Sequence, residues 1–505
     1  MREEPGGRGP RADAATPLER AAASLIDAPA RALRVTEGGR TRGRLSRETL
    51  ERVLQHQLSG VRVGDVLDPP APQVPARELP RRIGGRLRAG LDPDCVDWLQ
   101  RAGAVAAGAG TELHLVGGAV RDLLAGQAVR DLDLVASGDA RRLGRRLAAL
   151  PRTRFSWNDR FLTARLQLDG GATVDIAQAR DERYASAAAL PVVVPADLAT
   201  DLRRRDFTVN AIACDLAPQS FGRLVDPCGG RGDLARGIVR MLHGASMLDD
   251  PTRGFRAARL TARLGLRIEG CTARAIIAAV RLGVFERLSS QRLRREVEAW
   301  FAGPHVVETV RSAARLDLLR VLGLPAAPEP LAQRGLTELD RLLARADVRR
   351  TELLVWVTCL AALARGTRRP ARRRLAARLR PGRRAARLVV ELPATAAAIV
   401  RRVSALASPS ASRIHRACRG AAPEAVLLAA AWAASAVERK ALRSYLVHGR
   451  TQRPDLSGHD LLRAGIRPGP AIARGLEAAL RAKLDGRGVD RRSQLAAALR
   501  AARRA

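Results

Sequence analysis

The fold is decided by HLVGGAVRDLLAGQAVRDLDLVASGD, residues 114–139. Residues 113–116 predict a buried strand that ends at Gly117-Gly118. Glycines let the backbone approach a ligand closely, and the first amides of the helix that follows point at the same turn. Arg121, one turn into that helix, can add charge-assisted hydrogen bonds to phosphate oxygens. Because such turns also arise from tight strand-to-helix packing, this one by itself is weak evidence for a phosphate site.

A pair of carboxylates follows in Asp131-Leu132-Asp133-Leu134. Side chains alternate along a strand, so Asp131 and Asp133 share one face while the leucines enter the core. Two carboxylates on one face repel each other unless cations lie between them. A pair of divalent ions about 3.5–4 Å apart is the usual arrangement for phosphoryl or nucleotidyl transfer. A second Asp-x-Asp, Asp92-Pro93-Asp94, stands in a proline-containing loop and is not interpreted as a site.

A third carboxylate is a candidate for the same place. Residues 161–168 alternate in polarity, Gly170-Gly171 predicts a turn, and residues 172–176 predict a strand that returns antiparallel. Asp175 would then lie beside the pair and is predicted to be catalytic. An exposed aspartate at the end of a strand explains it nearly as well.

A basic segment comes next in RRRDFTVNAIACDL, residues 203–216. It joins Arg205 to Asp206 and Asn210, which are four residues apart and are expected on one helix face. Asp and Asn side chains suit ribose hydroxyls, and arginine suits phosphate. The cluster is also compatible with an ordinary charged helix start.

The last informative segment is DDPTRGFRAARLTARLG, residues 249–265, where Pro251 fits the first turn of a helix. Polar side chains recur there at every third position and form a stripe: Asp250, Arg253, Arg256 and Arg259. An Asp and an Arg side by side offer an acceptor and donors, which can mimic a Watson–Crick edge toward a base. A salt-bridged surface stripe is the alternative.

The composition agrees with a nucleic-acid partner. The 505 residues include 88 Lys+Arg and 51 Asp+Glu, a formal net charge of +37, and the only lysines are Lys440 and Lys483. Such an excess is typical of proteins that bind a polyanion, although a solvated arginine surface without a partner is the alternative. Aromatic residues make up only 3%, so binding would depend on charge more than on base stacking.

The sequence argues against a membrane or secreted protein. Its longest uncharged apolar run, residues 425–437, is shorter than the ~20 residues a membrane span needs, and its start has no apolar signal-peptide core. The six cysteines are scattered, without the spacing of a zinc site or a disulfide framework. We therefore expect a cytoplasmic protein.

Patterning divides the chain into five parts. Residues 1–25 are expected to be flexible, and residues 26–109 to hold a remnant module and a linker, with a capped helix starting after Ser46. Residues 110–242 predict the catalytic head, residues 243–300 a helical neck that carries the 249–265 helix, and residues 301–505 a helical body and tail. The fold class is α+β.

These segments, in this order, resemble the family of class II tRNA nucleotidyltransferases and bacterial poly(A) polymerases. The resemblance also includes LSGHDLLRAGIRPGPAIARGLEAALRAKLDG near the C-terminus, and it covers roughly residues 112–490. It implies a small mixed-sheet head and an all-helical neck, body and tail that hold the acceptor arm of tRNA.

The resemblance also implies roles for individual residues. Asp131 and Asp133 match the family's metal-binding aspartates, which would hold two Mg²⁺ ions. Gly118 and Arg121 match its contacts to the nucleotide triphosphate, and Arg205 and Asp206 lie in its ribose and triphosphate motif. Their neighbours Gly117 and Asn210 are also predicted to bind the nucleotide. Asp250 and Arg253 match the pair that reads the base, and Arg256 and Arg259 continue that helix. The expected reaction adds CCA, or the terminal A, to the 3′ end of tRNA from CTP and ATP.

Several points stay open at the level of sequence. The base-reading helix begins Asp249-Asp250 where many relatives have Glu-Asp, and residues 185–191, ASAAALP, lack the polar, glycine-containing loop often found there. Addition of CCA versus A alone is therefore undecided. The alternatives are a poly(A) polymerase acting on RNA 3′ ends and a non-catalytic RNA-binding protein. Residues 43–68 resemble a fragment of a cystathionine-β-synthase-type repeat, to which no ligand is assigned. The oligomeric state is unknown.

Overall fold

The structure is a computed structural model that describes most of the chain. The described residues are 10–26, 30–72, 79–129, 131–149, 153–159, 162–168, 173–348 and 350–503. They form two compact units, Met1–Arg292 with Arg315–Val321, and Leu293–Ala314 with Leu322–Ala505.

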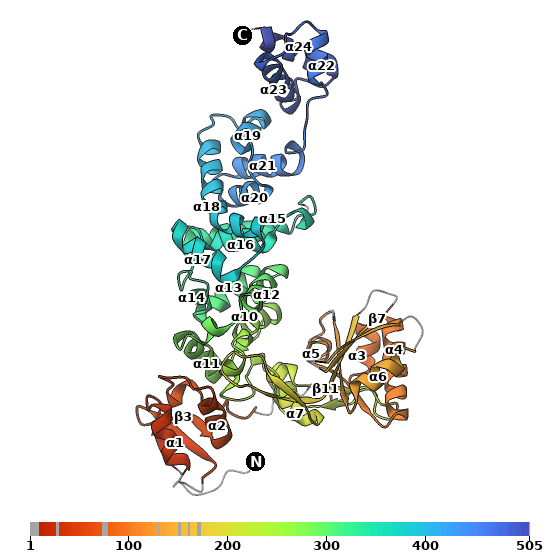
Figure 1. The fold of residues 1–505 in the computed structure, drawn as a ribbon, viewed down its shortest axis with the longest axis vertical. Coiled ribbons are helices and arrows are strands. Elements are labelled where there is room, and N and C mark those ends of the chain that lie inside the picture. Colours follow the sequence, from red (N-terminus) through yellow and green to blue (C-terminus); the bar gives the residue numbers. More distant parts are fainter. Residues whose placement is uncertain are drawn as a thin grey trace. The chain divides into compact units, whose positions relative to one another are not determined.

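The first unit opens with a small lobe, drawn in red in Figure 1. Its elements are β1 (Arg11–Asp13), α1 (Leu18–Ile26), β2 (Ala32–Glu37), β3 (Arg40–Ser46), α2 (Arg47–Gln55) and the 3-10 turn η1 (Val63–Asp65). β2 pairs with β1 in parallel and with β3 antiparallel. The predicted cap of α2 is present, because the side chain of Ser46 accepts a hydrogen bond from the amide of Thr49 at 3.2 Å.

The expectation of a flexible segment through residue 25 is wrong for residues 11–26. This part contains β1 and α1, and α1 buries Leu18 and Leu25 in the interior of the lobe. The sequence analysis missed α1 because Gly, Pro and Arg around it hide the apolar spacing of a short helix. Residues 1–9 lie outside the described part of the chain.

Seven strands form the central sheet of the first unit in the order β12-β11-β4-β5-β8-β7-β6. Their bounds are β4 (Glu112–Val116), β5 (Leu132–Ser137), β6 (Thr153–Asn158), β7 (Thr163–Leu168), β8 (Thr173–Gln178), β11 (Ala213–Asp215) and β12 (Leu224–Val225). β5 and β8 are parallel, whereas the other neighbouring strands in this sheet are antiparallel. The mixed sheet confirms the predicted head.

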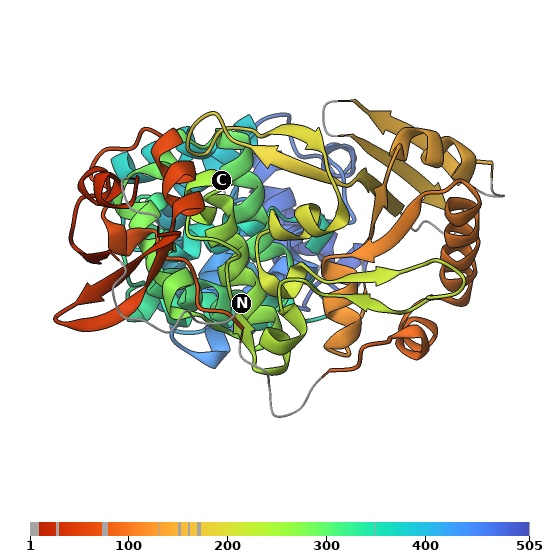
Figure 2. The same cartoon turned by 90° about the horizontal axis from the view of Figure 1, so that it is seen from below.

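The helices that precede or connect the first strands of this sheet are α3 (Gly84–Gly90), α4 (Pro93–Gly108), α5 (Gly118–Leu124) and α6 (Ala140–Leu147). Figure 2 shows the orange helices of this part of the chain beside the orange and brown strands. α6 lies close against the strands, since a Cβ on Gly144 would come within 2.7 Å of the ring of Phe155. Asp92-Pro93-Asp94 starts α4 instead of forming a loop. The side chain of Asp92 accepts a hydrogen bond from the amide of Asp94 at 2.9 Å, which makes it a helix cap.

The remaining elements of the first unit lie outside the central sheet. β9 (Arg180–Arg183) and β10 (Val192–Pro195) form a separate antiparallel ribbon. The others are α7 (Leu198–Arg203), η2 (Thr208–Asn210), α8 (Gly230–Ala235), β13 (Ile238–Val239), α9 (Ser246–Asp249), α10 (Thr252–Leu264), β14 (Arg267–Ile268), α11 (Gly270–Arg281), η3 (Val284–Arg287) and α14 (Leu318–Val321). Asp250 and Pro251 separate α9 from α10, and the chain turns a corner there because a proline is not accommodated within a helix.

The second unit contains helices and no strand among its described residues, as predicted. Two helices cross the boundary with the first unit, α12 (Ser290–Ala302) and α13 (Val306–Arg315). The others are α15 (Pro330–Leu343), η4 (Arg350–Glu352), α16 (Val355–Leu363), α17 (Arg369–Leu379), α18 (Arg383–Ser404), α19 (Ala411–Cys418), α20 (Pro423–Trp432), α21 (Ala436–Ser444), η5 (Tyr445–Gly449), α22 (Gly458–Arg463), α23 (Pro470–Leu484) and α24 (Arg491–Arg503).

The core of this second unit surrounds α20, which packs against α15, α16 and α18 and is buried from Glu424 to Trp432. Arginines cover the outside of α17 and α18, for example Arg373, Arg374, Arg383 and Arg387. No helix in the described ranges is both long enough and apolar enough to span a bilayer.

Candidate active site

The glycine turn lies where the sequence predicts it. β4 ends at Val116, α5 begins at Gly118, and Gly117 between them has φ 69° and ψ −127°. L residues rarely adopt this conformation, so the position favours glycine. Both glycines line a large cavity, and the backbone itself therefore forms part of the wall.

That cavity and a smaller one form a single cleft. The main cavity has a volume of about 780 Å³ and the side cavity about 290 Å³. The residues that line both are Gly118, Asp133, Asp206, Asn210 and Arg256. The cleft also gathers the other predicted site residues: Gly117, Asp175, Arg205, Asp250 and Arg253 in the main cavity, and Arg121, Asp131 and Arg259 in the side cavity.

Asp131 and Asp133 both face the cleft. Asp131 directly precedes β5 and Asp133 lies within it; both are exposed, while Leu132 and Leu134 are buried. Neither carboxylate accepts a hydrogen bond from the residues that the structure describes. The pKa of Asp133 is raised, first because protein atoms displace water around it; the charge of Arg205 opposes this shift, and the negative charges of Asp175 and Asp131 add to it. The nearby arginines therefore do not fully compensate the clustered carboxylates.

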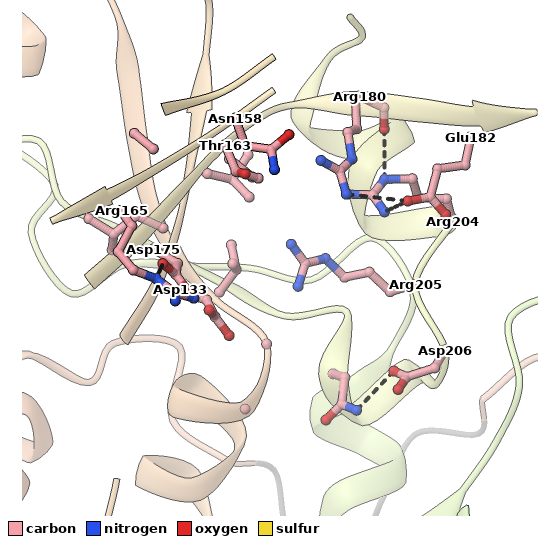
Figure 3. Close-up of a pocket in the computed structure, with 18 of the residues that line it drawn as sticks. Asp133, Asn158, Thr163, Arg165, Asp175, Arg180, Glu182, Arg204, Arg205 and Asp206 are labelled. Carbon is pink, nitrogen blue, oxygen red and sulfur yellow. Dashed lines mark hydrogen bonds and ion pairs between the residues drawn. The ribbon is translucent and has the colours of Figure 1, made fainter. Parts of the chain in front are cut away.

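Asp175 lies directly beside Asp133, because the parallel register of β5 and β8 pairs the two residues. The predicted antiparallel pairing with β7 is also present and sets Asp175 opposite Arg165. Arg165 donates from Nε to Oδ1 at 2.7 Å and from Nη2 to Oδ2 at 2.8 Å, as Figure 3 shows. Asp175 therefore adjoins the aspartate pair, but it already has a counter-ion.

The opposite wall of the main cavity is basic. Arg204 and Arg205 follow α7, and both donate to the buried carboxylate of Asp201; the Nη2 to Oδ2 distance from Arg205 is 2.9 Å. Burial would raise the pKa of Asp201, but the two guanidinium groups outweigh it and the pKa is lowered. Held in this way, the Arg205 side chain extends into the cavity toward Asp133 (Figure 3).

Sequence analysis missed three residues of this wall. Arg180, Glu182 and Tyr184 line the main cavity, where Glu182 accepts hydrogen bonds from Tyr184 Oη at 2.7 Å and Arg204 Nη1 at 2.6 Å. Their spacing of two residues on β9 and just beyond it is the signal that could have placed them on one face. That β9 leaves the central sheet and turns toward the cleft is a tertiary feature that spacing does not reveal.

Asp206 and Asn210 do not share a helix face, contrary to the prediction. Asp206 lies in a bend and Asn210 ends the 3-10 turn η2, yet Nδ2 of Asn210 still donates to Oδ1 of Asp206 at 2.9 Å. The amide of Phe207 donates to the same oxygen, and this local hydrogen bond competes with helix formation. Burial opposes ionisation of Asp206, but Arg256 and Asn210 outweigh it, so its pKa is lowered.

Arg121 is buried, with a relative exposure of 6%. Its Nε donates to Asp122 at 2.8 Å, and Nη1 donates to Oδ1 of Asn210. Burial lowers the pKa of Arg121, although Asp122 partly compensates. The guanidinium thus lines the side cavity while it also orients Asn210.

The corner between α9 and α10 carries Asp250. Its Oδ1 accepts hydrogen bonds from the amide of Thr252 at 3.0 Å and from Arg292 at 2.8 Å, and its Oδ2 accepts one from Arg256 at 2.9 Å. Burial would raise its pKa, but Arg256, Arg253 and Arg292 outweigh this effect and lower it. Asp250 is therefore held as an anion at the cavity wall.

The predicted polar stripe on α10 is only partly a surface feature. Arg256 and Arg259 are half-buried, but Arg253 is 3% exposed. Arg253 donates from Nη1 to Ser246 Oγ at 2.6 Å and from Nη2 to the carbonyl of Arg204 at 2.9 Å. Its Nε is buried and has no hydrogen-bond partner among the described residues. The arginine is fixed from both sides at the wall of the main cavity.

This arrangement has known counterparts. Residues 113–240 match the family described as the poly A polymerase head domain. An A-adding tRNA nucleotidyltransferase of Halalkalibacterium halodurans is 32% identical over 393 residues, which are 75% of this chain and 86% of that protein. The chain belongs to the class II tRNA nucleotidyltransferase family.

Two further relatives place this nucleotidyltransferase within the family. A CC-adding tRNA nucleotidyltransferase of Deinococcus radiodurans is 42% identical over 183 residues, covering 36% of this chain and 49% of that one. The CCA-adding enzyme of Thermotoga maritima, solved with tRNA, has a TM-score of 0.69 and 29% identity, over 83% of this chain and 98% of that one. The predicted fold class is thereby confirmed.

The cleft of the nucleotidyltransferase offers ligands for a hard cation. Within the described ranges no group of three or more His, Cys, Asp or Glu residues has the geometry of a metal site. Asp131 and Asp133 instead form an exposed carboxylate pair to which none of the described residues donates a hydrogen bond. Mg²⁺ is commonly bound by one or two carboxylates, with water and substrate phosphates completing its coordination. The residues present therefore fit Mg²⁺ that arrives with a nucleotide.

Proposed function

We propose that this enzyme extends the 3′ end of tRNA with nucleotides taken from ATP and CTP, releasing pyrophosphate. One observation carries the proposal. The exposed pair Asp131 and Asp133 faces a cleft whose other wall is the anchored guanidinium of Arg205. A triphosphate placed between them would meet cations held by the aspartates on one side and a fixed positive charge on the other. The names of the relatives support tRNA as the acceptor.

The aspartates would hold two Mg²⁺ ions, which lower the pKa of the attacking hydroxyl and neutralise the departing pyrophosphate. Gly117 and Gly118 would bring backbone close to the phosphates, and Arg205 would bind their oxygens. Asn210, oriented by Arg121 and Asp206, would meet the ribose. Asp175 would be a weaker participant, because Arg165 occupies both of its oxygens.

Base selection would fall to Asp250 and Arg253 at the far side of the main cavity. An ionised carboxylate accepts hydrogen bonds, whereas a guanidinium group donates them. A base that fails to match this pattern would leave buried polar groups unsatisfied, which discriminates more strongly than shape alone. Arg256 and Arg259 would add positive charge along the side cavity.

Which nucleotides are added is a separate part of the proposal. The relatives include A-adding, CC-adding and CCA-adding enzymes. Supplying ATP and CTP singly and together to tRNA ending before the CCA tail, or after its two cytidines, would separate these activities. A generic RNA primer in the same assay would reveal a poly(A) polymerase. We expect the reaction to take place in the cytoplasm, where tRNA is matured in bacteria.

Replacing the carboxylates tests the proposal. Asp131→Asn and Asp133→Asn should each lower nucleotide incorporation by about 10²-fold or more, while tRNA affinity changes less than about threefold. Asp94→Asn is the matched control, because it removes an exposed aspartate from the chain's other Asp-x-Asp. Incorporation near the wild-type rate in Asp133→Asn would overturn the metal assignment. No incorporation by the wild-type chain with Mg²⁺ or Mn²⁺ would favour a non-catalytic RNA-binding protein.

A further inference from the structure

The N-terminal lobe reaches the residue next to Asp250. Asp249 is fully buried, and Oδ1 lies 2.8 Å from Nε2 of His56 while Oδ2 lies 2.9 Å from Nη2 of Arg52. His56 is itself buried, with 1% of its side chain exposed. The contact to His56 is a hydrogen bond, whereas that to Arg52 has ion-pair distance without hydrogen-bond alignment. Both partners come from the C-terminal half of α2 or its cap.

The charge balance at Asp249 depends on this contact. Burial would raise the pKa of Asp249, but the hydrogen bond from His56 and the charges of Arg52 and Arg253 outweigh it and lower the pKa to about 2. Asp249 is therefore a buried anion, and a buried anion that loses its partners must move or take up a proton. Because Asp250 follows directly in the chain, such a movement would be passed to it.

A second contact runs from the same helix to the cavity wall. The guanidinium of Arg52 lies over the ring of Tyr184, 5.9 Å from its centroid. Tyr184 donates its hydroxyl hydrogen to Glu182, and Glu182 accepts a hydrogen bond from Arg204. Arg52 thus touches both the base-reading corner and the wall opposite the aspartates, although it does not line the cleft itself.

The backbone around the corner is also fitted closely to the lobe. A Cβ on Gly244 would lie 2.1 Å from the carbonyl oxygen of Val66, and Oδ1 of Asp68 accepts a hydrogen bond from the amide of Gly244 at 3.3 Å. Residues 243–249, which lead into Asp250, therefore have α2 and the segment after η1 as a fixed support.

We propose that Arg52 and His56 are positioning residues for nucleotide selection, and that the N-terminal lobe serves as a rigid support for the base-reading corner. They act through Asp249 on Asp250, and Arg52 also acts through Tyr184. This inference rests on the proposed role of Asp250 and Arg253 in reading the base. It gives the lobe a function in catalysis that requires no ligand of its own.

The test compares charge-removing and conservative substitutions. Arg52→Met and His56→Leu should raise KM for the correct nucleotide about tenfold and reduce the preference over GTP and UTP by a similar factor. KM for tRNA should stay within about twofold, because Arg52 and His56 contact Asp249 and Tyr184 and neither residue lines the cleft. Arg52→Lys and His56→Gln keep a cation or a donor in place and should restore most of the preference.

The matched control is Glu51→Gln, which changes an exposed residue on the same helix. Thermal unfolding of each variant shows whether the fold is retained. Equal loss of activity with all four nucleotides, without a change in KM or in preference, would overturn the inference and indicate a purely structural lobe. The inference would also be overturned if Arg52→Lys and His56→Gln restored no more of the nucleotide preference than Arg52→Met and His56→Leu.

Failure of the proposed function can be recognised separately. If the wild-type chain incorporates no nucleotide, the proposed function is wrong. Equilibrium binding of ATP, CTP and GTP to the same variants then decides the inference, since a positioning role requires the binding preference to shift in Arg52→Met and His56→Leu but not in Glu51→Gln. Unchanged preference in that measurement would overturn it.

Discussion

The backbone of Gly117 and the guanidinium of Arg205 occupy adjoining space in the main cavity. A Cβ on Gly117 would lie 3.0 Å from Nη1 of Arg205, closer than nearly all real contacts of this kind. The two residues come from different parts of the sheet domain, the end of β4 and the segment after α7. The glycine therefore supplies the turn geometry and also leaves room for the arginine.

Gly117→Ala should consequently lower nucleotide incorporation as well as strain the backbone. The positive φ of 69° alone is expected to lower the free energy of unfolding by about 1–3 kcal/mol, and displacement of Arg205 should reduce nucleotide incorporation by about tenfold or more. Gly126→Ala is the control, because its φ is 67° and nothing lies within 4 Å of its Cβ position. Steady-state kinetics and thermal unfolding check both. Equal incorporation by the two variants would contradict the role of the close approach.

The ion pair between Arg165 and Asp175 predicts an unequal contribution of the three carboxylates. Asp175→Asn should retain clearly more activity than Asp133→Asn, because Asp175 is neutralised by Arg165 whereas Asp133 is not hydrogen-bonded by any described donor. Arg165→Gln should lower the Mg²⁺ concentration that gives half-maximal activity, since it frees a carboxylate beside the pair. Titration of activity against Mg²⁺ measures both effects. If Asp175→Asn is as inactive as Asp133→Asn, Asp175 is a full metal ligand.

Arg253→Ala should blur the choice of nucleotide. It removes a buried guanidinium that is fixed by Ser246 and the carbonyl of Arg204, and it leaves Asp250 with fewer positive neighbours. We expect the ratio of kcat/KM values for ATP or CTP over GTP and UTP to fall by roughly 10–100-fold. Arg259→Ala, on the same helix but in the side cavity, should leave this ratio nearly unchanged. Selectivity retained in Arg253→Ala would refute the base-reading role.

His243 makes the stability of the first unit sensitive to acid. Burial lowers its pKa from 6.5 to about 3, opposed by Asp249 and reinforced by Arg52, Arg253 and His56. Between these two pH values the unfolded chain binds a proton that the folded chain does not. Stability should therefore fall on acidification, at a rate that approaches about 1.4 kcal/mol per pH unit, and this term should vanish above pH 6.5.

The measurement is guanidinium unfolding of the wild type and His243→Gln from pH 4.5 to 7.5. The difference between the two proteins should shrink steadily as the pH falls, because only the wild type loses stability through this imidazole. Parallel curves at all pH values would show that His243 takes up its proton in the folded state. Asp249, whose pKa is lowered to about 2, contributes its own loss only in more acidic solution.

Binding of tRNA should be strongly salt-dependent. Proteins that neutralise six or more phosphates lose about 10³-fold in affinity between 50 and 200 mM salt, and the exposed arginines of the second unit are expected to act in this way. Filter binding or fluorescence anisotropy over that range provides the slope. Affinity that stays flat would exclude the arginine surface as the tRNA-binding face.

The local features of the site could be predicted from sequence, whereas its tertiary contacts could not. The strand, the Gly117-Gly118 turn, the helix and the alternation around Asp133 all depend on residues close together in the chain, and all are confirmed. Asp175 lies beside Asp133 as expected, although the parallel pairing of β5 with β8, and not the predicted hairpin with β7, brings the two residues together. The ion pair of Asp175 with Arg165 was not predicted, because the alternation of side chains shows which face of the strand a residue lies on but not which residue it contacts.

Contacts between distant segments were not predictable from the sequence, and one error has a local cause. His56 bonds Asp249 across 193 positions, and no period or spacing relates the two. The burial of Arg253 likewise depends on Ser246 and the carbonyl of Arg204, which meet only after α7 and α9 have packed. Asp206 and Asn210 have the spacing of a helix, but the local hydrogen bond to the amide of Phe207 favoured a bend.

The choice of arginine for almost every basic position has one more consequence. Lys440 and Lys483 are the only lysines, so nearly all the basic side chains are guanidinium groups, which stay protonated at any pH at which the protein is folded. Acetylation, which discharges lysine, has almost no target here. The positive charge of this enzyme is thus almost independent of lysine acetylation and of pH, so we expect ionic strength and competing polyanions to be what modulates its affinity for RNA.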